Sequence, residues 1–327
     1  MPTLRYNGLE FRADADESVL DCLLRHGQDV PSACRVGACQ TCLMRAVEGT
    51  PSTASQNGLR ETQRRQGCFL ACQCVPTDGL SAISASSDFE KVVQAEVIQK
   101  TWVSNSIVRL RLELRSPLDY SAGQFLRLRF PDGLQRSYSI ASLPGEPLEL
   151  HIRIFPKGEM GQRLSKQVRP GDVLEVVGPY GSCYYTPEDL DQPILMVASG
   201  SGLAPIWGIV RDALAQGHRG PIRIYHGSVT SQGLYYFPEL ARLSERNLNL
   251  SYVPCAETVE PSELHVRPGT AMEIAMEDHK VLTGWRVYTC GNPALVKAMK
   301  RAAYLAGADL DQILSDSFAD QGSVRTA

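Results

Sequence analysis

The chain has 327 residues and a formal net charge of −3, a balance that argues against a nucleic-acid partner. No apolar stretch approaches the roughly 18 residues of a membrane span. Residues 1–10 are polar where a signal peptide needs an apolar run, so the sequence predicts a cytoplasmic protein without a membrane segment. This length exceeds what one hydrophobic core usually holds, and two or three domains are expected.

The first predicted domain covers residues 1–88. Residues 4–6 and 9–12 predict short strands because apolar and polar side chains alternate there. A helix is expected after Ser18, which can cap it, and Gly27 is expected to end it. Residues 43–47 predict a further strand. The small polar residues at 81–88 predict the end of the domain and the start of a short linker.

Between the predicted helix and strand lie cysteines with the spacing of a two-iron cluster. Cys34, Cys39 and Cys42 form the pattern C-x4-C-x2-C, and a fourth ligand is available about thirty residues later at Cys72 or Cys74. A structural zinc site is the alternative. Zinc sites usually show two close C-x2-C pairs, and here only Cys39 and Cys42 form one.

This pattern resembles the plant-type [2Fe-2S] ferredoxins. The resemblance implies a β-grasp fold, and the L-x-C turn of that family selects Cys72 over Cys74 as the fourth ligand. Arg35 lies inside the loop, where it could hold the loop, meet carboxylates of a partner or simply be solvated. The other six of the ten cysteines are scattered and suggest no disulfide framework.

The second predicted domain covers residues 89–190 and begins with strands of period two at 92–102, 107–114 and 124–130, which predict a small antiparallel barrel. The sequence RSYS follows. It offers a cation for a pyrophosphate, a flat ring for a flavin and a hydroxyl near the flavin N5. These roles are expected for Arg136, Tyr138 and Ser139, and an ordinary exposed strand is the alternative.

The segments HIRIF, KGEMGQRL and VGPYG follow RSYS, and in this order they resemble the FAD barrel of the ferredoxin-NADP reductase superfamily. The resemblance implies that amides at a helix start bind the FAD pyrophosphate. Gly161 stands where the family has Ser or Thr, which removes one side-chain hydrogen bond. The residues expected to contact FAD are Arg136, Ser137, Tyr138, Ser139, His151, Arg153, Ile154, Gly158, Met160, Gly161 and Gln162.

The third predicted domain covers residues 191–327. The apolar strand ILMVAS runs into a glycine-rich turn and then a helix that ends at Gly217, an arrangement typical of a dinucleotide-binding corner. Its G-x-G-x-x-P pattern, from Gly200 to Pro205, differs from the usual fingerprint and resembles the same superfamily. Later strands from Ile222, Leu248 and Trp285 predict a doubly wound parallel sheet.

Two further segments resemble that superfamily. The C-G-x-P pattern from Cys290 implies a cysteine near the nicotinamide C4 and the flavin, with a buried strand-end cysteine as the alternative. The acidic-x-aromatic pattern of Asp316 and Phe318 implies a ring packed near the flavin, with a core phenylalanine as the alternative. The expected contacts of this domain are Gly200, Ser201, Gly202, Pro205, Cys290, Gly291, Asp316 and Phe318, and the expected catalytic residues are Tyr138, Ser139 and Cys290.

The preferred nicotinamide is expected to be NADH. A 2′-phosphate needs a positive cluster after the second strand of the sheet, and residues 227–236 contain no Lys or Arg. Val229 and Thr230 stand where oxygenase reductases often carry an arginine. The dinucleotide is therefore expected to be oriented without that side chain.

The order of ferredoxin, FAD barrel and NAD domain resembles the reductase components of multicomponent ring-hydroxylating oxygenases, of the naphthalene dioxygenase reductase type. The resemblance implies a multidomain α+β and α/β monomer that passes electrons from NADH through FAD to the [2Fe-2S] cluster. They would leave to a separate ferredoxin or to a Rieske or di-iron oxygenase. A reductase for radical-type sugar deoxygenation and a redox-responsive binding module remain open.

Overall fold

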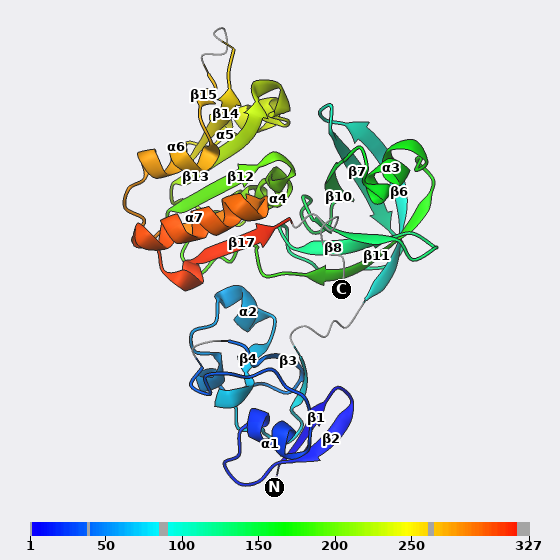
Figure 1. Cartoon of the computed structure of the whole chain (residues 1–327), viewed down its shortest axis with the longest axis vertical. Coiled ribbons are helices and arrows are strands. Elements are labelled where there is room, and N and C mark those ends of the chain that lie inside the picture. Colours follow the sequence, from blue (N-terminus) through cyan, green and yellow to red (C-terminus); the bar gives the residue numbers. More distant parts are fainter. Residues whose placement is uncertain (1, 38–39, 85–90, 261–264, 319–327) are drawn as a thin grey trace. The chain divides into compact units, whose positions relative to one another are not determined.

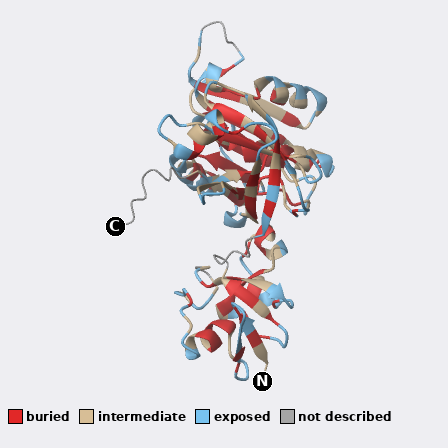
Figure 2. Ribbon diagram, turned by 90° about the vertical axis from the view of Figure 1, so that its right-hand side faces the viewer, coloured by how far each residue is buried: buried red, intermediate tan, exposed pale blue. Residues whose placement is uncertain are grey.

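The computed structural model describes residues 2–37, 40–84, 91–260 and 265–318, and the chain divides into two compact units, Met1–Phe89 and Glu90–Ala327 (Figure 1). We call these the N-terminal and the C-terminal unit. Each has its own hydrophobic core, and many of the buried residues lie on the strands (Figure 2). In the part of the chain so described, no helix has the length and hydrophobicity needed to cross a bilayer.

The N-terminal unit is built on a five-stranded sheet with the order β2-β1-β5-β3-β4. The elements are β1 (Thr3–Tyr6), β2 (Leu9–Arg12), α1 (Val19–Arg25), β3 (Leu43–Glu48), α2 (Glu61–Arg65), β4 (Cys68–Leu70) and β5 (Ser81–Ser84). The predicted helix is confirmed, because the Ser18 side chain caps α1 by accepting a hydrogen bond from the Asp21 amide. Gly27 follows with φ +74, a conformation that suits glycine at a helix end.

The residues at 81–88, expected to hold the end of the domain and the start of a linker, begin with a strand that the sequence analysis did not predict. Residues 81–84 form β5, which pairs in parallel with β1 and antiparallel with β3. Ala82 and Ile83 are buried in this position. Small side chains suit a central strand that packs between neighbours, and their low hydrophobicity concealed the strand. Residues 85–88 lie outside the described part of the chain.

The first half of the C-terminal unit is an antiparallel six-stranded sheet with the order β10-β7-β6-β11-β8-β9. Its elements are β6 (Val92–Trp102), β7 (Ile107–Leu114), β8 (Phe125–Arg129), β9 (Gln135–Ser139), β10 (Leu148–Arg153), α3 (Glu159–Lys166) and β11 (Val173–Tyr180). An antiparallel bridge between Ile140 and Leu150 connects the two edges. The sheet thereby closes into the predicted barrel around inward-facing leucines and valines.

The second half is a parallel sheet with the order β15-β14-β13-β12-β16-β17. Its elements are β12 (Ile194–Ser199), α4 (Leu203–Ala215), β13 (Ile222–Thr230), α5 (Phe237–Arg246), β14 (Leu250–Thr258), β15 (Arg267–Pro268), α6 (Ala271–Asp278), β16 (Arg286–Gly291), α7 (Pro293–Leu305) and β17 (Ile313–Ser317). Helices α4 and α5 share one core with the sheet, while α6 and α7 share another. The sheet is doubly wound.

The strand order reverses at the first strand of this sheet. The chain moves from β12 outward to β15 and then crosses to β16 on the other side of β12. In such sheets a crevice opens beyond the carboxyl ends of the two strands that flank the reversal. The backbones meet closely here, because a Cβ on Gly202 would lie 2.2 Å from the carbonyl oxygen of Cys290. Only glycine fits this turn.

Candidate functional site

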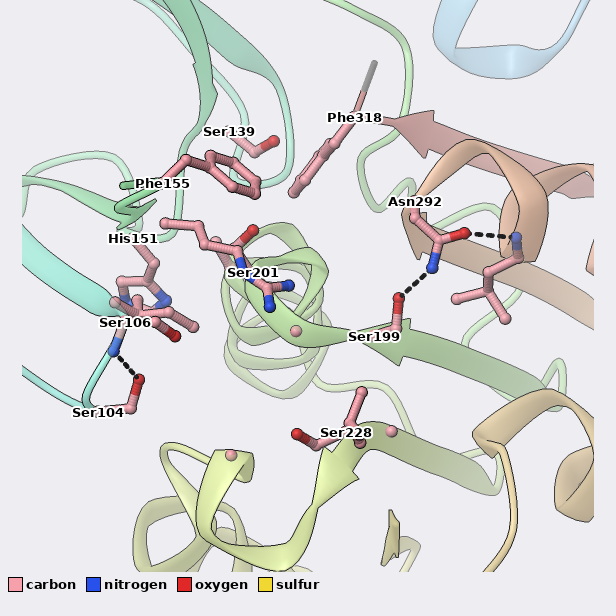
Figure 3. A pocket seen from close by; sticks show the side chains of 18 of the residues that line it. Ser104, Ser106, Ser139, His151, Phe155, Ser199, Ser201, Ser228, Asn292 and Phe318 are labelled. Carbon is pink, nitrogen blue, oxygen red and sulfur yellow. Dashed lines mark hydrogen bonds between the residues drawn. The ribbon is translucent and has the colours of Figure 1, made fainter. Parts of the chain in front are cut away.

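A cavity of about 1650 Å³ lies between the barrel and the carboxyl ends of the parallel strands. The barrel side of the cavity is formed by β9, β10, the start of α3 and the turn between β6 and β7. The opposite side is formed by the ends of β12, β13, β14 and β17 and by the starts of α6 and α7. Figure 3 shows His151 and Ser106 on the barrel side and Ser199 and Ser228 on the sheet side. Typical small-molecule pockets measure about 300–1,000 Å³. This cavity is large enough for an extended cofactor and a second nucleotide.

Most of the residues expected from the sequence to contact FAD or the nicotinamide dinucleotide line this cavity. They come from both halves of the unit: Arg136, Ser137, Tyr138, Ser139, His151, Arg153, Gly158, Met160, Gly161, Gly200, Ser201, Asp316 and Phe318. The fold therefore gathers motifs that are separated by up to 182 positions, from Arg136 to Phe318.

Positive charge gathers on the barrel side of the cavity. Arg136, Arg153 and Lys157 line it, together with Gly158 and Met160 at the start of α3. The amides in the first turn of a helix have no intrahelical partner, and no side chain caps α3. Cations beside free amides suit a pyrophosphate, so this region fits FAD.

Aromatic rings line the cavity beside this charged region. Phe155 and Phe318 extend into the space near Ser139 (Figure 3). Tyr138 also lines the cavity, and burial raises the pKa of its hydroxyl. Flat rings on several sides suit a planar isoalloxazine.

Ser139 joins the barrel to the last strand of the sheet. Its hydroxyl donates to Asp316 Oδ2 over 2.6 Å. Burial raises the pKa of Asp316, and the hydrogen bond from Ser139 opposes that rise. The hydroxyl that the sequence assigned to the flavin N5 therefore has a protein partner, and the pair couples β9 to β17 at the edge of the cavity.

The remaining expected contact residues do not line the cavity: Ile154, Gln162, Gly202, Pro205, Cys290 and Gly291. Cys290 is fully buried, its sulfur lies 3.9 Å from that of Cys183, and burial raises the pKa of its thiol. Pro205 is buried in the first turn of α4. The Gln162 side chain donates to the Phe155 carbonyl.

Sequence reasoning missed several lining residues. Ser104, Asn105 and Ser106 reach the cavity from the β6–β7 turn, and Glu257 reaches it from the end of β14. Nothing local marks these residues, since only the folded arrangement places them there. Asn292 did carry a signal, because a polar residue before Pro293 suits a helix start, and its side chain caps α7 by accepting from the Leu295 amide.

The sheet side of the cavity contains no cation among its described residues on β13, β14 and α6. Ser228, Thr230 and Gln232 offer neutral polar groups, and Glu257 adds a carboxylate. A 2′-phosphate would meet a negative charge there instead of an arginine or lysine. Ribose hydroxyls, by contrast, find hydrogen-bond acceptors.

In the N-terminal unit, the cysteine loop packs beside the segment that carries Cys72. Gln73 Nε2 donates to the Arg35 carbonyl over 3.0 Å and lies 3.7 Å from the Cys72 sulfur. Cys42 is within hydrogen-bonding reach of Cys72, and burial raises the pKa of its thiol. Cys74 instead lies fully buried in the core. Three candidate ligands, Cys34, Cys42 and Cys72, are described, whereas Cys39 lies outside the described residues.

Arg35 has φ +57, a left-handed conformation that is uncommon outside glycine. Its guanidinium pairs with Asp21 on α1 over 2.9 Å. Gly37 is also left-handed, and a Cβ there would lie 3.3 Å from Gln73 Cγ. The ion pair with Asp21 supports one of the three roles expected for Arg35, that of holding the loop in place. The spacing of these cysteines fits the ligands of an iron–sulfur cluster, although no group of three or more metal-binding side chains is found among the described residues, which exclude Cys39.

Comparison with known proteins identifies three domain families along the chain. Residues 3–77 match a 2Fe-2S iron-sulfur cluster binding domain, residues 94–185 an oxidoreductase FAD-binding domain and residues 196–301 an oxidoreductase NAD-binding domain. The reductase component of the naphthalene 1,2-dioxygenase system of Pseudomonas putida, a ferredoxin–NAD(P)+ reductase, is 32% identical over 93% of this chain and 94% of its own length. The chain belongs to this family of oxygenase reductase components.

The reductase has further relatives in sequence and in structure. The reductase subunit of an aromatic O-demethylase from Amycolatopsis is 30% identical over 90% of this chain and 92% of its own length. The crystal structure of an Amycolatopsis cytochrome P450 reductase superimposes with a TM-score of 0.69 at 28% identity, covering 97% of this chain and 99% of that one. The predicted fold class is confirmed. The reductase is an electron-transfer oxidoreductase whose cofactors are a [2Fe-2S] cluster, FAD and a nicotinamide dinucleotide.

Proposed function

We propose that this reductase takes electrons from NADH and delivers them to a separate ferredoxin or to the terminal oxygenase of an aromatic-compound dioxygenase or monooxygenase. The observation that carries the proposal is the cavity between barrel and sheet, with cations on one side and a neutral to acidic surface on the other. The relatives named for naphthalene dioxygenase and aromatic O-demethylase systems support the class of partner.

On the barrel side, Arg136 and the first-turn amides of α3 would bind the FAD pyrophosphate, and Tyr138 and Phe318 would pack on the flavin ring. When bound, FAD accepts a hydride and releases electrons singly to the cluster. Ser139 and Asp316 would fix the edge of the ring site, since their hydrogen bond couples β9 to β17. Buried Cys290 would support the nicotinamide site through the packing of β16 against Gly202.

On the sheet side, Gly200 and Ser201 would approach the NADH pyrophosphate, and Glu257 would accept from a ribose hydroxyl. Preference for NADH over NADPH follows from the lack of a cation among the described lining residues there. In the N-terminal unit, Cys34, Cys39, Cys42 and Cys72 would hold the cluster. Cys72 is favoured over Cys74 because it lies beside Cys42.

We assign three domains to the chain, at residues 1–88, 89–190 and 191–327, and infer a cytoplasmic monomer that needs neither membrane nor nucleic acid. Cys22, Cys42, Cys68, Cys72, Cys74, Cys183, Cys255 and Cys290 form no disulfide, which suits a reducing compartment. The family matches at 3–77, 94–185 and 196–301 are consistent with these boundaries.

An anaerobic titration of the purified protein with NADH tests the proposal, followed by visible absorbance and low-temperature EPR. We expect the flavin band to bleach and the signal of a reduced [2Fe-2S] cluster to develop with it. A parallel titration with NADPH should proceed much more slowly. Bleaching without a cluster signal in iron-replete protein would contradict the cysteine assignment, and equal rates with both nucleotides would contradict the NADH preference.

A further inference from the structure

A buried polar network joins the barrel to the parallel sheet behind the cavity. His151 on β10 approaches Tyr235 Oη with Nδ1 over 3.1 Å and Glu149 Oε1 with Nε2 over 2.9 Å. Tyr236 donates to the same Glu149 oxygen over 3.0 Å. The His151 side chain is 0% exposed and that of Glu149 13%. Two consecutive tyrosines of the sheet half thus bind two residues of one barrel strand.

Further contacts hold Tyr236 in an uncommon conformation. Its φ is +58, in the left-handed region that non-glycine residues rarely adopt. Arg109 on β7 donates to its hydroxyl over 3.3 Å, and the Trp207 ring on α4 stacks on its ring with centroids 5.3 Å apart. The position of this side chain is therefore fixed from both halves of the unit.

The dinucleotide-binding loop, which we define as residues 227–233 at the end of β13 and in the turn after it, leads to these tyrosines and also lines the cavity. Ser228, Thr230 and Gln232 lie on it, only a few residues before Tyr235. His151 lines the cavity from the opposite side (Figure 3). One network therefore contacts the end of the dinucleotide-binding loop and the strand that carries a lining residue of the barrel.

We propose that Tyr235 and Tyr236 are positioning residues that hold the dinucleotide-binding loop, residues 227–233, at a fixed distance from the flavin-binding barrel. The inference rests on the proposed function, because the loop matters for catalysis only if NADH binds there. Hydride transfer depends steeply on the separation of donor and acceptor. The two tyrosines, which we call the latch, set this separation and so affect the reaction without contacting the reacting atoms.

The test replaces each hydroxyl in the full-length protein by Tyr235→Phe and Tyr236→Phe, with Tyr304→Phe as the matched control because Tyr304 is 54% exposed. We expect the rate of flavin reduction at saturating NADH to fall about tenfold in each latch variant, since small displacements have large effects on rate. Hydrogen–deuterium exchange should rise in residues 227–236 of the same variants, measured without nucleotide. The control should change neither quantity.

A second variant approaches the network from the barrel. Glu149→Leu removes the acceptor oxygen and should reproduce both effects, and combining it with Tyr236→Phe should add little, because both remove the same interaction. Unchanged hydrogen–deuterium exchange in the loop would overturn the proposal. An unchanged rate of flavin reduction with only a lower melting temperature would also overturn it. If the unaltered protein were not reduced by NADH at all, the proposed function itself would fail, which is a separate result.

Discussion

Four histidines of the C-terminal unit have a pKa below the usual value because burial disfavours the charged ring: His151, His218, His226 and His279. The effect is largest at His226, where complete burial lowers the pKa to about 3. Its Nδ1 approaches Tyr252 Oη over 3.3 Å, and its Nε2 is buried with no hydrogen-bond partner among the described residues. His226 is therefore held neutral in the folded protein.

Acidification should destabilise the C-terminal unit through this residue. In the unfolded chain the pKa of His226 returns to about 6.5, so the unfolded state binds the proton first as the pH falls. The contribution of neutral His226 to the free energy of unfolding is complete above that pH. It is lost progressively below it, by about 2 kcal/mol at about pH 5. We expect His226→Gln to show a flatter dependence of melting temperature on pH between about 7.5 and 5. Parallel curves for the two proteins would contradict this.

A substitution of Glu257 tests why the protein would prefer NADH over NADPH. Replacing it by arginine places a cation at the end of β14, where the described lining is otherwise neutral. We expect Glu257→Arg to raise kcat/KM for NADPH by roughly tenfold and to lower it for NADH, because the guanidinium can pair with a 2′-phosphate. Glu257→Gln serves as the control that removes charge alone and should give a smaller shift. Steady-state kinetics with both nucleotides measure the change.

Among the secondary-structure elements, α3 depends on a side chain from another element. Lys100 on β6 donates to two backbone carbonyls in the last turn of α3, those of Leu164 and Ser165, over 3.1 and 2.9 Å, and to that of Val168 just after the helix over 2.6 Å. Carbonyls in the last helical turn lack intrahelical partners, and a cation there also favours the helix dipole. The orientation of the helix start that faces the cavity is thereby set from its far end.

Lys100→Met should loosen this helix. We expect a loss of about 1 kcal/mol and a melting temperature lower by about 2–4 °C, because three carbonyls lose their donor. FAD should also dissociate more readily, since the first turn of α3 lines its site. Lys280→Met, at an exposed position outside the helices and strands, is the control and should leave both quantities unchanged. Differential scanning fluorimetry and flavin fluorescence measure them.

Some of the secondary-structure elements could be predicted from the sequence, and others could not. Period-two strands and capped helices were predictable because their signals are local, as at residues 107–114 and at Ser18. Strand β5 was not, since Ala82 is buried only by strands that lie distant in sequence. For the same reason the RSYS residues of the site could be named in advance, whereas Ser106 and Glu257 could not.

The whole molecule consists of units with separate cores, so each should retain its own chemistry when isolated. A protein that begins at Lys91 should keep its flavin absorbance and reduce ferricyanide with NADH within roughly twofold of the full-length rate. It should lose the EPR signal and the reduction of cytochrome c. A full-length Cys72→Ser variant is the control that removes the cluster alone. Loss of flavin from the shortened protein would show that the units are interdependent.

Strand β5 also has a consequence for the order of folding during synthesis. It is the only element that joins the β1–β2 hairpin to the β3–β4 pair within the described sheet, and it is the last strand of its unit to leave the ribosome. The cysteine loop is thus synthesised well before the sheet around it can close. The fourth expected ligand, Cys72, precedes the end of β5 by only 12 residues, so the full set of four cysteines is synthesised only shortly before the two halves of the sheet can join.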